Sequence, residues 1–134
     1  MAIEKYVLSI DQGTTSTRAV IVDKNGNIVE KAQREIKLIY PHNGWVEANA
    51  IDIWISVVEC INELMIKANI TWKSIESIGI ANQRETVVGF NKETGIPIYN
   101  AIIWQSRQSE EISNSSFEVF QNFLILQSKT NNYS

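Results

Sequence analysis

Two apolar runs separated by a short polar segment constrain the fold of this chain more than any other feature of its sequence. Residues 6–10 and 19–22 are almost entirely apolar, and residues 11–18 between them read Asp-Gln-Gly-Thr-Thr-Ser-Thr-Arg. Near-continuous apolar character is typical of strands that are covered on both faces. We therefore expect a central strand at residues 6–10, a second strand at residues 17–23, and a tight polar turn between them.

The chemistry of this turn is suited to binding phosphate. Gly13 lets backbone N–H groups approach an anion closely, Asp11 is a hard oxygen ligand for Mg²⁺ or its bound waters, and Arg18 carries a permanently charged guanidinium. Three hydroxyl donors lie between them, on Thr14, Thr15 and Ser16. The short Asp-x-Gly-Thr motif alone fits an ordinary hairpin turn equally well. The full strand–turn–strand context favours phosphate.

The next part of the chain predicts an α/β fold with a mixed sheet. Asn25-Gly26 is a strong hairpin signal, so residues 28–36 should form a third strand and complete an antiparallel meander. Asn49 can cap a helix whose apolar residues recur at helical spacing. Residues 75–81 then read as another buried strand, which a right-handed crossover brings beside the first. The residues of the apolar helix stripe, expected to face the core, are Ile51, Trp54, Ile55, Val58, Ile61, Leu64 and Met65.

Composition excludes several classes of function. The chain has 134 residues, 44% hydrophobic and 20% charged, with a net charge of −3 and no basic run. These values fit one soluble globular domain and argue against a nucleic-acid partner or an anionic membrane surface. No apolar segment is long enough to span a bilayer. Cys60, the single cysteine, fits a reducing, cytoplasmic setting and a small packed side chain, and His42 is read as a plain loop histidine.

A second group of polar residues follows the strand expected at residues 75–81. Ligands of open α/β sheets sit outside the carboxyl ends of strands, so Asp11 and the Arg84-Glu85 pair should face one crevice. A carboxylate accepts hydroxyl hydrogen bonds and a guanidinium donates to hydroxyl oxygens. Together they would read a small polyol, with Trp104 as an apolar wall for its carbon chain. The plainer alternatives are a surface ion pair for Arg84-Glu85 and core packing for Trp104.

Four segments of the chain resemble the glycerol kinases, a branch of the carbohydrate kinase (FGGY) family. They are residues 11–18, the Gly-Trp-Val-Glu of residues 44–47, the Asn-Gln-Arg-Glu-Thr of residues 82–86, and the Pro-Ile-Tyr-Asn-Ala-Ile-Ile-Trp-Gln of residues 97–105. The likeness runs in order from residue 6 to about residue 107. It implies the ribonuclease H-like fold of the actin-like ATPases, with this chain as an incomplete amino-terminal lobe.

The resemblance also implies a cytoplasmic enzyme that phosphorylates glycerol to glycerol 3-phosphate with ATP and Mg²⁺. It implies that the first turn contacts the nucleotide phosphates and that Asp11 binds the metal, and it is compatible with a homo-oligomer in the full-length family form. The implied phosphate-binding residues are Thr14, Thr15, Ser16 and Arg18, and the implied glycerol-binding residues are Arg84, Glu85 and Trp104. A kinase for another polyol or sugar is disfavoured by Arg84-Glu85 with Trp104.

The likeness fades after residue 112, which predicts two parts: residues 1–112 as kinase domain and residues 113–134 as a divergent tail. The general base and the adenosine pocket of the family lie in regions without a counterpart here, so no catalytic residue is assigned. We therefore expect a truncated or frame-shifted kinase that is inactive alone. The alternative is a non-catalytic remnant that binds polyol or phosphate weakly.

Overall fold

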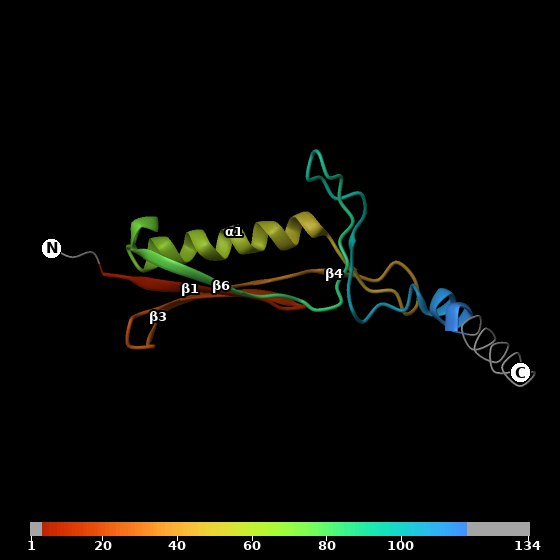
Figure 1. The fold of residues 1–134 in the computed structure, drawn as a ribbon, viewed down its shortest axis with the longest axis horizontal. Helices are drawn as coiled ribbons and strands as arrows, with labels where there is room; N and C mark the ends of the chain where they lie inside the picture. The colour runs from red at the N-terminus through yellow and green to blue at the C-terminus, as the bar shows by residue number, and fades with distance from the viewer. Residues whose placement is uncertain (1–3, 118–134) are drawn as a thin grey trace, which may run out of the picture.

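The main body of the molecule is one mixed sheet with a helix along one face (Figure 1). The computed structural model describes residues 4–117. The elements are β1 (Tyr6–Gln12), β2 (Ser16–Val22), β3 (Ile28–Glu35), β4 (Leu38–Ile39), β5 (Glu47–Ala48), α1 (Ala50–Lys67), a 3₁₀ turn (Trp72–Ser74), β6 (Ile75–Ala81) and β7 (Ala101–Ile102). The main sheet has the order β3-β2-β1-β6 and a small second sheet the order β4-β5-β7.

The first three strands form the predicted antiparallel meander. At the turn between β2 and β3, Gly26 has a φ of +84°, a conformation that glycine adopts without steric penalty. The carboxylate of Asp23 accepts the backbone N–H groups of Asn25 and Asn27, each at 2.8 Å. These bonds close the hairpin that the Asn-Gly pair predicts.

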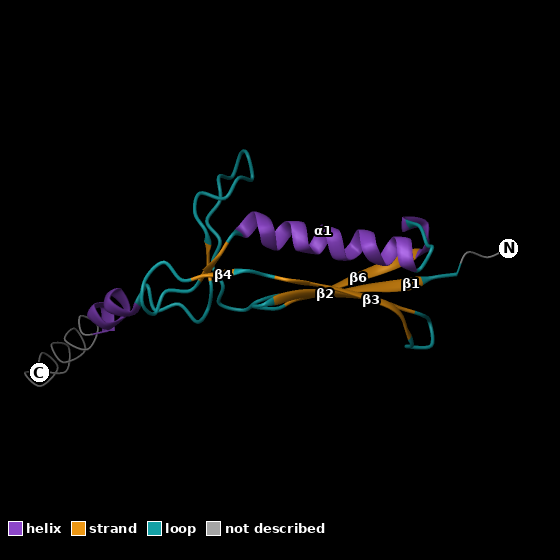
Figure 2. Cartoon of the chain, turned by 180° about the vertical axis from the view of Figure 1, so that it is seen from behind, coloured by secondary structure: helices purple, strands orange, loops and turns teal. Residues whose placement is uncertain are grey.

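The predicted strand–helix–strand unit is confirmed. The Asn49 side chain caps α1 by accepting the backbone N–H groups of Ile51 at 2.8 Å and Asp52 at 3.3 Å. After α1 and the 3₁₀ turn, β6 pairs with β1 in parallel, with Leu8 opposite Ile78. The view from behind shows α1 running along the sheet (Figure 2). Among residues 4–117, no helix is long and apolar enough to cross a bilayer.

The face of α1 that packs on the sheet includes only part of the predicted stripe: Leu64 is buried, and Ile61 and Met65 pack against the core. Ile51, Trp54, Ile55 and Val58 are exposed, with Trp54 at 64%. Ser56, Cys60 and Leu64 are the buried residues of the helix, and Cys60 is packed as expected. Ser56 tolerates burial because its hydroxyl bonds to Thr17 on β2 and to the carbonyl of Ile53. Apolar residues occupy more than one side of this helix, so its spacing identified only part of the side that contacts β2 and β3. The main core consists of Leu8, Ile10, Ala19, Ile21, Ala32, Cys60 and Leu64.

The prediction that β1 and β6 are buried on both faces is wrong within the described residues. Val7 on β1 is 39% exposed, and Ile78 and Ile80 on β6 are 51% and 73% exposed. α1 packs against β2 and β3, and β6 is the edge strand on the side away from β3. The apolar character of β6 therefore lies on an uncovered part of the sheet.

The second sheet was largely missed by the sequence reading. Residues 38–49 contain β4 and β5, each of two residues. Residues 86–90 make only isolated bridges, through Val87 and Phe90. Two-residue strands have too little periodicity to be recognised from sequence. The division of the chain at residue 112 stays a prediction, and most of its tail, residues 118–134, lies outside the described residues.

Candidate functional site

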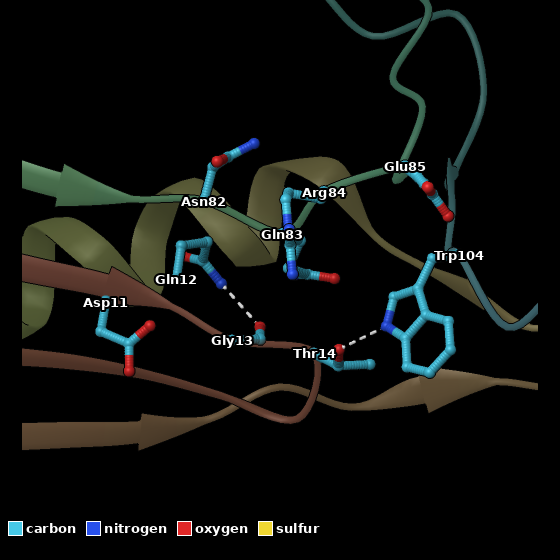
Figure 3. A pocket seen from close by; sticks show the side chains of 9 residues that line it. All are labelled: Asp11, Gln12, Gly13, Thr14, Asn82, Gln83, Arg84, Glu85 and Trp104. Carbon is cyan, nitrogen blue, oxygen red and sulfur yellow. Dashed lines mark hydrogen bonds between the residues drawn. The ribbon is translucent and has the colours of Figure 1, made fainter.

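A cleft of about 470 Å³ opens at the carboxyl ends of β1 and β6 (Figure 3). The two strands are parallel neighbours, so the segments that follow them meet at one edge of the sheet. The predicted shared crevice for Asp11 and the Arg84-Glu85 pair is confirmed by this cleft. Its lining residues are Asp11, Gln12, Gly13, Thr14, Asn82, Gln83, Arg84, Glu85 and Trp104.

The turn between β1 and β2 is tight around Gly13. The Gly13 N–H donates to the carbonyl of Ser16 at 3.0 Å. A Cβ at position 13 would lie 3.0 Å from that same carbonyl oxygen, which is closer than side chains normally approach. The carbonyl of Thr15 accepts the N–H of Ile36 at 2.8 Å. The geometry of the turn that presents Thr14 to the cleft therefore favours glycine at position 13.

Trp104 closes one end of the cleft and bonds directly to the turn. Its indole Nε1–H donates to the Oγ1 of Thr14 at 2.8 Å (Figure 3). Its backbone N–H donates to the Oγ1 of Thr86 at 3.4 Å. The Trp104 side chain is 52% exposed, so core packing is not its role among the described residues. The exposed indole is one of the walls of the cleft.

Glu85 is held in an uncommon backbone conformation. Its φ is +64°, in the left-handed region that few residues other than glycine adopt. The neighbouring turn is braced by Thr86, whose hydroxyl donates to the Oε1 of Gln83 at 3.2 Å. Such strain is stored most often at functional sites. In Figure 3 the Glu85 carboxylate lies at the Trp104 end of the cleft, and Asp11 lies at the opposite end.

The charged groups of the cleft are not neutralised by each other. None of the ion pairs found among residues 4–117 involves Asp11, Arg84 or Glu85. All three side chains belong to exposed residues. The surface ion pair considered for Arg84-Glu85 is therefore not formed in this part of the chain, and both groups are free to meet a ligand.

Three of the predicted phosphate-binding residues lie outside the lining of the cleft. Thr15 is exposed in the turn, and Ser16 begins β2 opposite Glu35. Arg18 lies opposite Asp11 across the hairpin, and its guanidinium donates through Nε and Nη2 to Gln33 Oε1, both at 3.3 Å. Their contact with phosphate stays a prediction.

Sequence reasoning missed Glu47, a buried carboxylate in β5. It is 1% exposed, yet it accepts hydrogen bonds from Tyr99, Asn100 and Gln108. Burial acts to raise the pKa of Glu47, but the three donors outweigh it and the pKa lies below the usual value. The same contact raises the pKa of Tyr99, mainly through its hydrogen bond to Glu47. A glutamate after Gly-Trp-Val offered no signal of burial, because its partners lie about fifty residues away.

Comparison with known families identifies the class of this domain. Residues 6–131 match the model described as the N-terminal domain of the FGGY family of carbohydrate kinases. The chain belongs to this family.

Within the family, the similar proteins include glycerol kinases. Glycerol kinase of Pasteurella multocida is 54% identical over 114 residues, which cover 85% of this chain and 23% of that protein. Glycerol kinase of Oceanobacillus iheyensis is 56% identical over 109 residues, 81% of this chain and 22% of that protein. This chain thus spans about a quarter of the length of these curated relatives.

Solved structures give the same result for the fold. Plasmodium falciparum glycerol kinase with ADP aligns with a TM-score of 0.74 and 35% identity, over 84% of this chain and 22% of that one. Gluconate kinase of Lactobacillus acidophilus aligns with a TM-score of 0.77 and 28% identity, over 86% of this chain and 23% of that one. The predicted α/β fold of the actin-like ATPases is confirmed.

Proposed function

We propose that this chain forms the part of a glycerol kinase in which glycerol meets the phosphates of ATP. The observation that carries the proposal is the cleft itself, which joins Asp11 and Thr14 of the first turn to Arg84, Glu85 and Trp104. These residues come from three separate segments of the chain. The identity of 51–56% to curated glycerol kinases supports glycerol over other polyols and sugars.

The polyol end of the cleft would be built by Arg84, Glu85 and Trp104. The Glu85 carboxylate is an acceptor for two hydroxyl groups, and the Arg84 guanidinium donates to hydroxyl oxygens. The Trp104 indole supplies an apolar surface for the carbon backbone. A molecule without hydroxyls would leave both charged groups without partners, so it would bind poorly.

The phosphate end would be built by the first turn. Thr14 and the backbone of Gly13 face the cleft, and Thr15, Ser16 and Arg18 would contribute from the adjoining surface. Asp11 fits Mg²⁺ because its exposed carboxylate lies in the cleft without an ion-pair partner among the described residues. Residues 4–117 hold no cluster of three or more His, Cys, Asp or Glu that would bind a metal alone, which suits an ion that keeps waters and phosphate oxygens as ligands. When bound, Mg²⁺ would neutralise phosphate charge during transfer.

The test separates binding from turnover. Calorimetry on the purified 134-residue chain measures glycerol binding, and an assay with ATP and Mg²⁺ measures phosphorylation. We expect binding without turnover, because no residue of this chain is assigned as general base. Turnover would contradict that expectation and place the whole reaction in this chain. Absence of glycerol binding by a folded sample would overturn the glycerol assignment.

A chimera decides between a kinase domain and a simple binder. This chain would replace the matching segment, 23% of the length, of Pasteurella multocida glycerol kinase. Glycerol-dependent ATP hydrolysis or phosphorylation by the chimera supports a kinase domain. An inactive but folded chimera supports the non-catalytic alternative. The cytoplasmic setting, expected from the single cysteine, and a homo-oligomeric state stay predictions.

A further inference from the structure

Glu47 is a buried charged group that lies outside the cleft. It sits in β5 opposite Ile102 of β7 and is 1% exposed. Burying a carboxylate is unfavourable unless hydrogen bonds replace water. Three donors do so here: Tyr99 Oη at 3.0 Å, Asn100 Nδ2 at 2.8 Å and Gln108 Nε2 at 2.7 Å. An arrangement with this many charge-assisted bonds resists displacement of any donor.

The three donors bracket Trp104 in the sequence. Tyr99 and Asn100 precede it, and Gln108 follows it. The only regular structure between them is β7, which is two residues long. So short a strand holds its place weakly by itself. Backbone bonds from Ile103 to Val46 and from Arg107 to Gly44 also hold this segment. The Glu47 carboxylate joins its two ends, so that residues 99–108 form a loop around it.

The same loop reaches the cleft. Ile102 pairs with Val87 through two backbone hydrogen bonds of 2.9 Å, which ties the loop to the turn that carries Glu85. Trp104 then bonds through its backbone to Thr86 and through its indole to Thr14. A shift of the loop would therefore move the indole relative to both ends of the cleft.

We infer that Glu47 is a positioning residue, whose carboxylate fixes residues 99–108 so that the Trp104 indole forms the wall of the cleft. Glu47 does not line the cleft itself, so it acts through Trp104. The role of that wall in polyol recognition rests on the proposed function, whereas the placement of the indole does not. Glu47, the last residue of the Gly-Trp-Val-Glu motif, would therefore act on the site by holding Trp104 in place, without contacting a ligand.

Hydrogen exchange of the Trp104 indole N–H tests the inference without any ligand. The resonance is assigned in a ¹⁵N-labelled sample of the full chain by its loss in Trp104→Phe. Glu47→Gln keeps the shape of the side chain but replaces one acceptor oxygen with a donor. We expect indole exchange to become about tenfold faster in this variant, the effect of losing roughly one hydrogen bond.

Two further variants serve as a packing control and as a second test of the carboxylate cluster. Ile36→Val removes a methyl group from the core cluster that includes Ala101 and Ile103 of the loop. It leaves the carboxylate and its three donors intact, so it controls for looser apolar packing and indole exchange should stay near the wild-type rate. Gln108→Ala keeps the carboxylate with its two other donors and covers the case in which Glu47→Gln does not fold. It should speed exchange by a smaller factor.

The outcomes separate this inference from the proposed function. Indole exchange that is faster in Glu47→Gln and Gln108→Ala but unchanged in Ile36→Val supports the positioning role. This holds even if the wild-type chain fails to bind glycerol. Unchanged exchange in the folded Glu47 and Gln108 variants overturns it. An equal acceleration in Ile36→Val also overturns it, because that result would reflect general loosening.

Discussion

The indole Nε1–H of Trp104 donates a 2.8 Å hydrogen bond to the hydroxyl of Thr14, 90 residues earlier in the chain. Thr14 belongs to the turn proposed to meet phosphate, and Trp104 to the wall proposed to meet the polyol. The two halves of the cleft are thus joined by one side-chain contact. A substitution at either residue should therefore change the position of the other side chain.

Thr14→Val should release the indole, because valine has the shape of threonine without an acceptor. We expect the indole N–H resonance of Trp104 to move toward that of an exposed tryptophan. Thr14→Ser keeps the hydroxyl and is the matched control. Equal movement of the resonance in both variants would contradict a direct bond between Thr14 and Trp104.

Replacing Glu85 by glycine should weaken glycerol binding but relieve backbone strain. Glu85→Gly should abolish glycerol binding, because the main hydroxyl acceptor is lost. It should also be more stable than Glu85→Ala by about 1 kcal/mol, because glycine relieves the φ of +64°. Calorimetry measures the first effect and urea unfolding the second. Unchanged glycerol affinity would refute the acceptor role, and equal stability of the two variants would refute the strain.

Asp11→Asn should separate metal-dependent chemistry from polyol binding. The substitution removes the negative charge but keeps the size of the side chain, so Mg²⁺ would lose a ligand it prefers. In the chimera with the Pasteurella multocida enzyme, we expect the Mg²⁺-dependent rate to fall far more than glycerol affinity does. Equal loss of both would indicate a structural role for Asp11.

Glu47 should make the folded chain sensitive to acid. Its pKa in the folded state is lowered, so the stability it contributes is present above the unfolded pKa of about 4.3 and is lost as pH falls through the folded value. The urea midpoint should fall more steeply between about pH 5 and about pH 3 in wild type than in Glu47→Gln. Asp23 and Glu63 also have lowered pKa values. Both residues are present in wild type and in Glu47→Gln, so they do not contribute to the difference between the two curves. Parallel curves would contradict the buried carboxylate cluster.

At neutral pH, Glu47→Gln should lower the free energy of unfolding by about 1 to 3 kcal/mol, because a buried hydrogen-bonding group loses a partner. Glu93→Gln, in an exposed turn, changes the same charge at a solvated position and should have little effect. Urea unfolding measures both. A loss of similar size in the Glu93 variant would show that net charge is responsible.

The uncovered part of the main sheet should cause self-association. Ile78 and Ile80 lie on the α1 side of β6, in register with core residues Leu8 and Ile10, yet they are exposed. Exposed apolar patches of this kind favour association. Ile78→Thr with Ile80→Thr should lower the apparent mass at high concentration in sedimentation experiments. Ile28→Thr, on the opposite edge strand and 63% exposed, is the control and should change it less.

Much of the fold followed from local signals in the sequence. Asn25-Gly26 specified a hairpin, and Asn49 specified the start of α1, because both act through backbone groups a few residues away. The shared cleft of Asp11 and Arg84-Glu85 was also predictable. Parallel pairing of β1 with β6 brings the carboxyl ends of these two strands together, whatever the side-chain packing.

Tertiary structure alone decided which surfaces are covered and which side chains meet. The apolar residues of α1 lie on more than one side, so contact with β2 and β3, and not helical spacing, selected Cys60 for burial over Trp54. Glu47 became a buried anchor because Tyr99, Asn100 and Gln108 converge on it from a distant loop. The bond between Trp104 and Thr14 likewise depends on that loop being in place. Such contacts join residues far apart in the chain, and the periodicity of a sequence carries no information about their distances.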